Sequence, residues 1–330
     1  MLAQIVDKLR AAKSVLLSTH RQSDGDGLGA QIALFHGLKK AGIQTRIVSV
    51  DRPPRKYDFL GTEQCIEVFT PETSVRTELA LILDTNDARL VEPLYSALKN
   101  QVDEVIFIDH HPVLAHGPAP TKGSFIDIQA ASTGELAFRI LKALEIPLDA
   151  TIARALYTSL VFDTQLFRFV KSDPTSHLLA AELLRFEREP EEVHRKLFAN
   201  YTVEKLSALI AALSQVEYLA SNRIAFIPVR TTLSQGGLDR DESGDVIDQV
   251  MNINSIEVAA LLREDAPKKF KLSLRSKGTV EVLSLAESFG GGGHRYASGA
   301  YLEGTFDDLR DRLIRGLHQL VPYASKGTNL

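Results

Sequence analysis

The chain has 330 residues, of which 44% are hydrophobic and 24% are charged, close to the averages of globular proteins. These values exclude a disordered, collagen-like or coiled-coil chain, and the length predicts two domains. The 38 basic and 42 acidic residues give a net charge of -4, which argues against a protein that holds long nucleic acid by electrostatics alone. A short, highly charged ligand still fits, because it needs only a local basic pocket.

The single cysteine and the N-terminal segment bear on the cellular compartment. Cys65 alone cannot form an internal disulfide or a thiolate metal cage, which fits a reducing environment. The N-terminus MLAQIVDKLR has the pattern of an amphipathic helix rather than of a signal peptide, and no run of 18 apolar residues occurs. We therefore expect a cytoplasmic protein without a membrane partner.

The first half of the sequence alternates buried strand patterns with helical patterns, which is typical of a parallel sheet built from β-α-β units. Strands are expected at residues 14–19, 45–50, 79–84 and 104–109. Between them, a helix should run from about Leu28 to Gly42. Ser132 and Glu135 form a capping box ahead of a helix that ends near Leu144. Further helices are expected over residues 151–162 and 175–185.

The second half begins with a charged helical pattern over residues 189–218, in which no strand is expected. Strand patterns return at 223–229, 256–262 and 269–275, and a last helix is expected over 306–320. We therefore predict an α/β domain over residues 1–188 with a parallel sheet and helices on both faces. A helical linker over 189–220 should join it to a smaller α+β domain over 221–330.

Acidic and histidine side chains follow the predicted strands of the first domain. They are His20, Asp24 and Asp26 after the first strand, Asp84 at the end of the third, and Asp109, His110 and His111 at the end of the fourth. Because ligands bind at the carboxyl ends of parallel strands, these side chains should converge at one edge of the sheet. So many negative groups repel one another, and divalent cations are the usual compensation.

Carboxylate and imidazole ligands without thiolates suit Mn²⁺, Mg²⁺, Fe²⁺ or Zn²⁺, and two such ions about 4 Å apart are common in phosphoryl chemistry. Glycines in the DGDGLG segment let the loop turn tightly, so that Asp24 and Asp26 can address different ions. Any one of these residues alone is more often a helix cap or a buried polar group. The segment lacks the later oxygen ligands of a calcium loop, and the chain has no P-loop or nucleophile-elbow motif.

Several segments resemble the DHH-family phosphoesterases of the nanoRNase and pAp phosphatase type. They are HRQSDGDGLGA, LDTNDARL, the DHH triplet followed by Pro112, VFDTQLFRF, SLRSKG and FGGGGHRYASGA, and together they span about residues 14–303. The chain departs from the family pattern at Arg21-Gln22, at Gly27 and at Gln165-Leu166, none of which is a metal ligand. The last change borders the expected substrate cleft near Arg168, so it bears on the preferred substrate more than on the reaction.

The resemblance implies two divalent metal ions, for which we expect Mn²⁺. One ion would be bound by His20, Asp24 and Asp84, and the other by Asp26, Asp84, His110 and Asp163, with Asp84 bridging. From the residues alone, Asp163 is as readily a helix cap as a ligand. Asp109 would orient a histidine, and His111 would face the substrate phosphate.

The glycine-rich segment at 290–293 has a physical interpretation of its own. Consecutive glycines expose backbone N–H groups to a phosphate, and the neighbouring His294 and Arg295 add donors, although a turn without a ligand is an alternative. The resemblance adds an anchor at the end of a predicted strand. The expected substrate contacts are Arg168, Arg275, Ser276, Gly292, Gly293, His294 and Arg295. Tyr57, Phe167 and Tyr296 either stack on a base or have only a structural role.

These expectations describe a metal-dependent phosphoesterase that hydrolyses short oligoribonucleotides, 3′,5′-bisphosphate nucleosides such as pAp, or both, by two-metal activation of water. The alternatives are a phosphodiesterase for linear or cyclic signalling dinucleotides and a non-catalytic nucleotide sensor. A RecJ-type exonuclease fits less well because the chain lacks extra DNA-binding domains, and a family II pyrophosphatase because of the glycine-rich segment. The metal, the cleavage polarity and a homodimeric state stay open.

Overall fold

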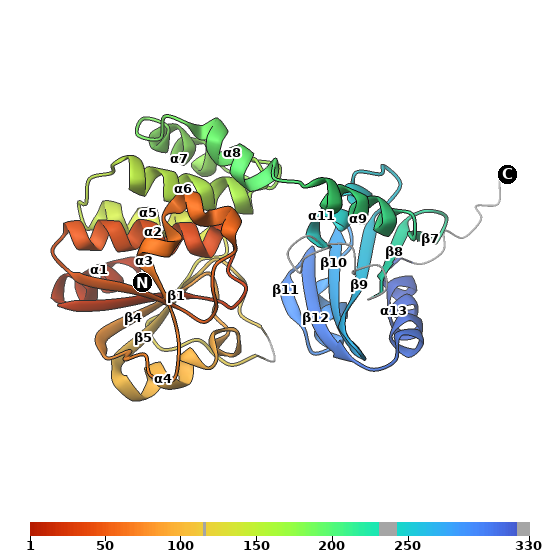
Figure 1. Cartoon of the computed structure of the whole chain (residues 1–330), viewed down its shortest axis with the longest axis horizontal. Coiled ribbons are helices and arrows are strands. Elements are labelled where there is room, and N and C mark those ends of the chain that lie inside the picture. The colour runs from red at the N-terminus through yellow and green to blue at the C-terminus, as the bar shows by residue number, and fades with distance from the viewer. Residues whose placement is uncertain (115–116, 231–242, 322–330) are drawn as a thin grey trace. The chain divides into compact units, whose positions relative to one another are not determined.

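The computed structural model describes residues 1–114, 117–230 and 243–321, and the chain divides into two units between Asn200 and Tyr201 (Figure 1). The first unit contains a six-stranded sheet. Its strands are β1 (Ser14–Thr19), β2 (Gln44–Ser49), β3 (Ile66–Val68), β4 (Thr77–Leu83), β5 (Val102–Asp109) and β6 (Phe125–Ile126). The order is β3-β2-β1-β4-β5-β6, and every neighbouring pair is parallel.

Helices cover both faces of this sheet. They are α1 (Leu2–Ala11), α2 (Gly25–Lys40), α3 (Thr62–Cys65), α4 (Leu94–Gln101), α5 (Thr133–Ala143), α6 (Ala150–Asp163), α7 (Thr175–Leu183) and α8 (Pro190–Phe198), with the 3-10 helices η1 (Arg55–Leu60) and η2 (Ala88–Val91). Helices α1, α2, α5 and α6 share one core with side chains such as Leu17 and Leu81, while α4 and η2 pack on the other face against Leu16 and Ile82. Burial on both faces explains why the strands are almost wholly apolar.

The strand order changes direction at one place on the sheet edge. The chain places β2 on one side of β1 and β4 on the other, so the carboxyl ends of β1 and β4 lie at a topological switch point. Asp24 then begins α2 as its N-cap, with a side-chain oxygen that accepts from the backbone N–H of Asp26 at 3.0 Å. Loops and helix ends rich in acidic residues therefore meet where such folds bind ligands.

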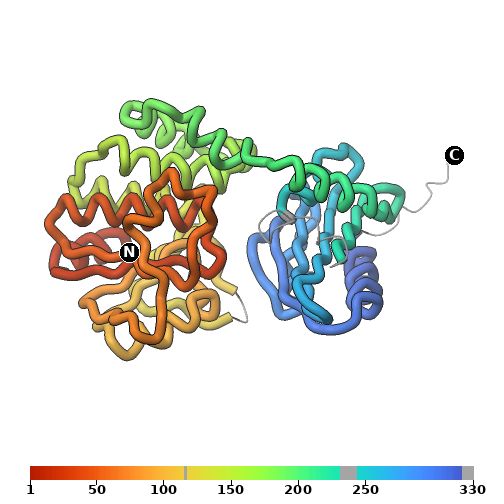
Figure 2. The backbone as a smooth tube through the Cα atoms, in the orientation of Figure 1, coloured from red at the N-terminus to blue at the C-terminus, as the bar shows by residue number. Residues whose placement is uncertain are grey.

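The second unit contains a mixed sheet between two layers of helices (Figure 2). Its strands are β7 (Glu217–Leu219), β8 (Ile224–Val229), β9 (Val258–Ala266), β10 (Lys269–Ser276), β11 (Gly292–His294) and β12 (Ala297–Glu303), in the order β11-β12-β10-β9-β8-β7. Only β8 and β9 are parallel among these described strands. Helices α9 (Val203–Leu213) and α11 (Ser243–Met251) cover one face, and α12 (Leu283–Ser288) and α13 (Phe306–Leu320) cover the other.

The predicted fold class is confirmed: a parallel α/β domain is followed by a smaller α+β domain. The predicted linker contains α8, which packs on α6 and η1, and α9, which packs on α11 and β8. The expectation of no strand in this segment is wrong, because Glu217–Leu219 form β7 against β8. A strand of three residues is too short to show a periodic pattern. The boundaries at residues 188 and 221 stay predictions.

The second half of the glycine-rich segment forms β11, so the segment is more than the turn that was considered as an alternative. A side chain at Gly291 would place Cβ 2.0 Å from the carbonyl oxygen of Gly299. At Gly293, where φ is +130°, Cβ would lie 2.7 Å from the carbonyl oxygen of Ala297. Glycine is needed here for close approach of β11 to β12.

Among the residues that the structure describes, no helix is long and apolar enough to cross a membrane.

Candidate metal centre

The polar side chains expected at the sheet edge lie in two groups that meet at Asp84. The first group is formed by His20 after β1, Asp24 at the start of α2, and Asp84 after β4, with one ligand atom of each within 4.8 Å of the others. His20 Nε2 lies 3.4 Å from Asp84 Oδ2. His20 Nδ1 donates to the carbonyl oxygen of Arg21 at 2.8 Å, so Nε2 is the ring nitrogen directed to the carboxylates.

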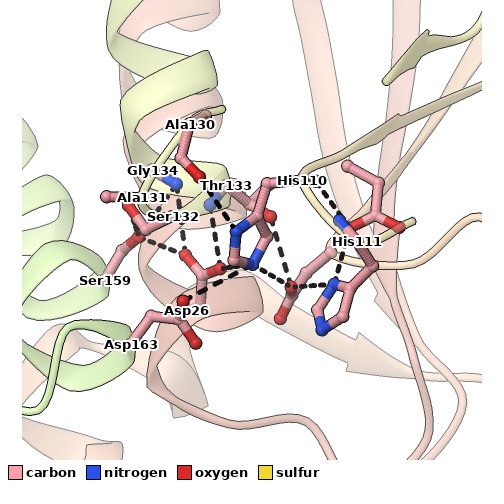
Figure 3. Close-up of polar contacts among 12 residues, drawn as sticks. Asp26, His110, His111, Ala130, Ala131, Ser132, Thr133, Gly134, Ser159 and Asp163 are labelled. Carbon is pink, nitrogen blue, oxygen red and sulfur yellow. Dashed lines mark hydrogen bonds and ion pairs between the residues drawn. The ribbon is translucent and has the colours of Figure 1, made fainter. Parts of the chain in front are cut away.

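The second group is formed by Asp26 on α2, His110 after β5 and Asp163 at the end of α6 (Figure 3). His110 Nε2 lies 3.3 Å from Asp26 Oδ2 and 3.5 Å from Asp163 Oδ2. The same nitrogen is 3.8 Å from Asp84 Oδ1. The two oxygens of Asp84 therefore face different histidines, one in each group.

The backbone holds Asp84 in an unusual conformation. Its φ is 61°, in the left-handed region, where aspartate is tolerated better than most residues with a side chain. Its N–H donates to the carbonyl oxygen of Ile108 at 3.0 Å, and the hydroxyl of Thr133 donates to its Oδ1 at 3.2 Å. Strained residues of this kind cluster at functional sites.

Repulsion among the buried carboxylates of the cluster favours the binding of cations. Burial, together with the negative charges of Asp26 and Asp24, raises the pKa of Asp84 well above its usual range. Burial also raises the pKa of Asp163 to about 6. Burial opposes protonation of His110, but the charge of Asp163 and the contact with Asp26 outweigh it and raise the pKa of His110 to about 10. Two divalent cations would relieve this repulsion, and the donor set of oxygens and imidazole nitrogens suits them.

Asp26 is held by the N-terminus of α5 and by α6 (Figure 3). Its carboxylate accepts from the backbone N–H of Thr133 at 2.8 Å and of Gly134 at 3.2 Å, and from the hydroxyl of Ser159. Burial alone would raise the pKa of Asp26, but the hydrogen bond and charge of His110, with the bonds from Ser159 and Thr133, lower it below its usual range. Asp26 therefore stays ionised and able to bind a cation.

Asp109 is fully buried next to His110 and His111 and orients His111. Its Oδ1 accepts from His111 Nδ1 at 2.8 Å, and its Oδ2 accepts from the amide of Asn86 at 2.7 Å. Burial alone would raise the pKa of Asp109, but the charge and hydrogen bonds of His111 lower it. Because an ionised carboxylate only accepts, His111 Nδ1 carries a proton and Nε2 is left for a substrate.

Three residues of the site were not predicted from the sequence: Asn86, Thr133 and Ser159. Asn86 follows a strand end and was part of the LDTNDARL segment, so its position alone could have indicated it. Thr133 and Ser159 lie on helices that are distant from Asp26 in sequence, and no local pattern marks them. The predicted metal ligands are thus brought together by the fold, and their role as ligands stays a prediction.

The residues predicted to contact substrate have varied surroundings. Arg168 is exposed in the turn after α6, and its guanidinium carbon lies 5.6 Å from the centre of the Phe169 ring. Arg275 Nη1 donates to the carbonyl oxygen of Leu274 at 3.1 Å, and the hydroxyl of Ser276 accepts from the N–H of Gly278 at 3.3 Å.

The end of the glycine-rich segment contains one ion pair that the sequence did not suggest. Gly292, Gly293 and His294 form β11, at the edge of the described sheet. Arg295, which follows, places Nε 2.9 Å from an oxygen of Glu281. Arg295 therefore already has an acidic partner.

The three aromatic residues considered for base stacking differ in exposure. Tyr57 is fully buried. Phe167 is partly buried and stacks on His177, with 5.0 Å between ring centres. Tyr296 is 36% exposed, with Arg295 over its ring. The first two rings are occupied by packing within the protein.

The fold and the site together define a parallel α/β domain with a cluster of carboxylates and imidazoles suited to divalent cations, followed by a second domain. Comparison with known proteins identifies the family. The chain belongs to the DHH family: residues 14–160 match the DHH family N-terminal domain, and residues 221–320 match the DHHA1 domain. This confirms the resemblance found in the sequence.

Two relatives and two solved structures illustrate the similarity. The bifunctional oligoribonuclease and PAP phosphatase NrnA of Thermus thermophilus is 26% identical, over 96% of this chain and 93% of that protein. The protein of the same name from Bacillus subtilis is 25% identical, over 97% and 98%. An exopolyphosphatase-related protein from Bacteroides fragilis has the same fold, with a TM-score of 0.86, 21% identity and coverage of 96% and 95%. RecJ of Thermus thermophilus in complex with Mn²⁺ gives a TM-score of 0.55 and 18% identity, over 96% of this chain and 54% of RecJ.

Proposed function

We propose that this chain is a metal-dependent phosphoesterase that hydrolyses short oligoribonucleotides, 3′,5′-bisphosphate nucleosides such as pAp, or both. It is a hydrolase acting on phosphoester bonds. The observation that carries the proposal is the position of Asp84, whose two oxygens face His20 and His110 at 3.4 and 3.8 Å. A carboxylate placed between two separate ligand groups is suited to bridge two ions.

The side chains have distinct roles in this proposal. His20, Asp24 and Asp84 would hold one cation, and Asp26, Asp84, His110 and Asp163 the other. When bound, two divalent cations would lower the pKa of a water and would offset the charge of the phosphoryl oxygens. Asp109 fixes the tautomer of His111, so that Nε2 is the atom available to exchange a proton or a hydrogen bond with the substrate. We propose Mn²⁺ as the ion.

The preferred substrate is inferred from the relatives and from charge. Proteins named oligoribonuclease and PAP phosphatase match this chain over nearly its whole length. A net charge of -4 suits a ligand with few phosphates better than a long nucleic acid. A signalling dinucleotide phosphodiesterase uses the same kind of metal centre and is the second candidate. A homodimeric state and a cytoplasmic location stay predictions.

One assay tests the proposal. The protein is stripped of metal with a chelator, and Mn²⁺ or Mg²⁺ is then added back. The substrates are pAp, a linear dinucleotide, a cyclic dinucleotide and a longer RNA. We expect hydrolysis of pAp or the linear dinucleotide only after metal is restored, with the longer RNA turned over slowly. Undiminished hydrolysis without metal would contradict the metal-dependent mechanism, and preference for the cyclic compound would favour the second candidate.

A further inference from the structure

The turn that follows Asp163 has an unusual backbone. Gln165, Leu166 and Phe167 have φ values of 46°, 59° and 65°, so three consecutive residues with side chains are left-handed. Glycine adopts this conformation without strain, whereas other residues do so at a cost. The turn is closed by a hydrogen bond from the N–H of Leu166 to the carbonyl oxygen of Val161 at 2.9 Å. Retained strain next to a ligand cluster suggests that the side chains of this turn have a function.

The side chains of this turn differ in their surroundings. Phe167 points back and stacks on His177. Leu166 and Phe169 remain in solvent, with 42% and 58% of their surface exposed. Phe169 is the most exposed phenylalanine among the residues that the structure describes. Val170, at 37%, is exposed in the same segment, and exposed apolar side chains that gather in one place are candidates for contact with a ligand.

The backbone of Phe169 is joined to the end of α6, the helix that carries Asp163 of the candidate metal centre. Its N–H donates to the carbonyl oxygen of Thr164 at 3.0 Å, and Thr164 directly follows Asp163. The carboxylate of Asp163 is 3.5 Å from His110 Nε2. The guanidinium of Arg168 lies over the Phe169 ring, so a cationic and an aromatic surface are presented together.

We propose that Phe169, with Arg168 beside it, stacks on the base of the nucleotide whose phosphate is held at the metal centre. The inference rests on the proposed function. A phosphate and a base are carried by the same sugar, so a base must lie near the rim of a site that holds the phosphate. Every base has a flat π face, so stacking selects for a nucleotide without selecting a base. It therefore favours nucleotides over inorganic polyphosphate.

The test compares pAp with an abasic analogue that has the same sugar and phosphates and hydrogen in place of the base. In the metal-loaded protein, Phe169→Ala should lower kcat/KM for pAp by about 10-fold to 100-fold, the size of one lost stacking contact. It should leave hydrolysis of the abasic analogue unchanged. Phe169→Tyr should retain activity on pAp. Tyr218→Ala, which removes a ring of 48% exposure from β7, is the matched control and should change neither rate.

Three results would overturn the proposal: equal losses on both compounds, no loss on pAp, or no rescue by Phe169→Tyr. If the wild-type protein hydrolysed neither pAp nor a dinucleotide, the proposed function would fail. Calorimetric measurement of the binding of pAp and of the abasic analogue would then decide whether Phe169 stacks on the base. Equal affinities of the wild-type protein and Phe169→Ala for pAp would reject it.

Discussion

At the scale of single residues, Asp84 serves binding at the expense of stability. Burial and neighbouring carboxylates raise its pKa well above 3.8, so the ionised form is unfavourable in the metal-free fold. The unfolded chain releases this proton first, so the metal-free protein loses stability as the pH rises above about 3.8 and through the folded pKa. Bound cations would stabilise the ionised form of Asp84 and so offset this loss of stability.

We predict that Asp84→Asn changes stability and activity in opposite directions. Asparagine keeps the shape and removes the charge, so in chelator the variant should be more stable than the wild type, by about 1 kcal/mol. It should lose turnover and most of its stabilisation by Mn²⁺. Thermal unfolding with and without Mn²⁺, and hydrolysis of pAp, measure these effects. Equal stabilisation of both proteins by Mn²⁺ would reject the bridging role.

A second prediction concerns Asn86, which supports the pair of Asp109 and His111. Its amide donates to Asp109 Oδ2 at 2.7 Å and to the carbonyl oxygen of His111 at 3.0 Å. Loss of such a supporting contact costs about 10-fold to 100-fold in activity at metal sites. Asn86→Ala should therefore lower kcat while metal content, measured by elemental analysis, stays near wild type. The control is Asn100→Ala on the exposed part of α4, and an unchanged kcat in Asn86→Ala would count against the support role.

At the scale of elements, the sequence predicts those with a long apolar pattern and misses the short ones. The strands over 14–19 and 104–109 and the helix over 306–320 are close to β1, β5 and α13. β6, with two residues, and β7, with three, are paired by their neighbours rather than by their own pattern. The cluster of carboxylates and imidazoles could be predicted because the carboxyl ends of the strands converge. The contact of Ser159 with Asp26 could not be predicted from the sequence, because the packing of helices brings these two residues together.

The contact between α6 and α8 supports a prediction about stability. Glu187, just before α8, is 2% exposed and is paired with Arg154 of α6, with Nε 2.7 Å from Oε2. Arg154→Met would leave this carboxylate buried without its cation, which costs about 3 kcal/mol. Urea unfolding should show this loss, and the double variant with Glu187→Gln should recover part of it.

The matched control for this prediction is Arg46→Met. Its partner Glu67 is also contacted through a single ion pair, but both side chains are more than 40% exposed. Exposed pairs contribute about 1 kcal/mol or less. If both variants lost the same small amount of stability, the buried ion pair would not be what holds α8 on the first unit.

At the scale of the whole molecule, each unit has its own hydrophobic core, and the chemistry of the two units differs. The first unit contains the carboxylate and imidazole cluster. In the second unit, Arg275 lies at the end of β10 and His294 at the end of β11. A metal centre binds only the phosphate that is cleaved, so recognition of a longer substrate needs a further anion site. We predict that the second unit provides it.

Arg275→Ala and His294→Ala should therefore separate substrate recognition from catalysis. Each change removes a hydrogen bond or charge-assisted contact worth about 1.5 to 3 kcal/mol, which lowers kcat/KM for pAp and a dinucleotide by about 10-fold to 100-fold. Hydrolysis of bis(p-nitrophenyl) phosphate should persist, because it is too small to need an anchor. Arg295→Ala should have a smaller effect, since Arg295 is 66% exposed and already paired with Glu281. Equal losses on the nucleotide and artificial substrates, or no loss on either, would show that the second unit does not anchor the substrate.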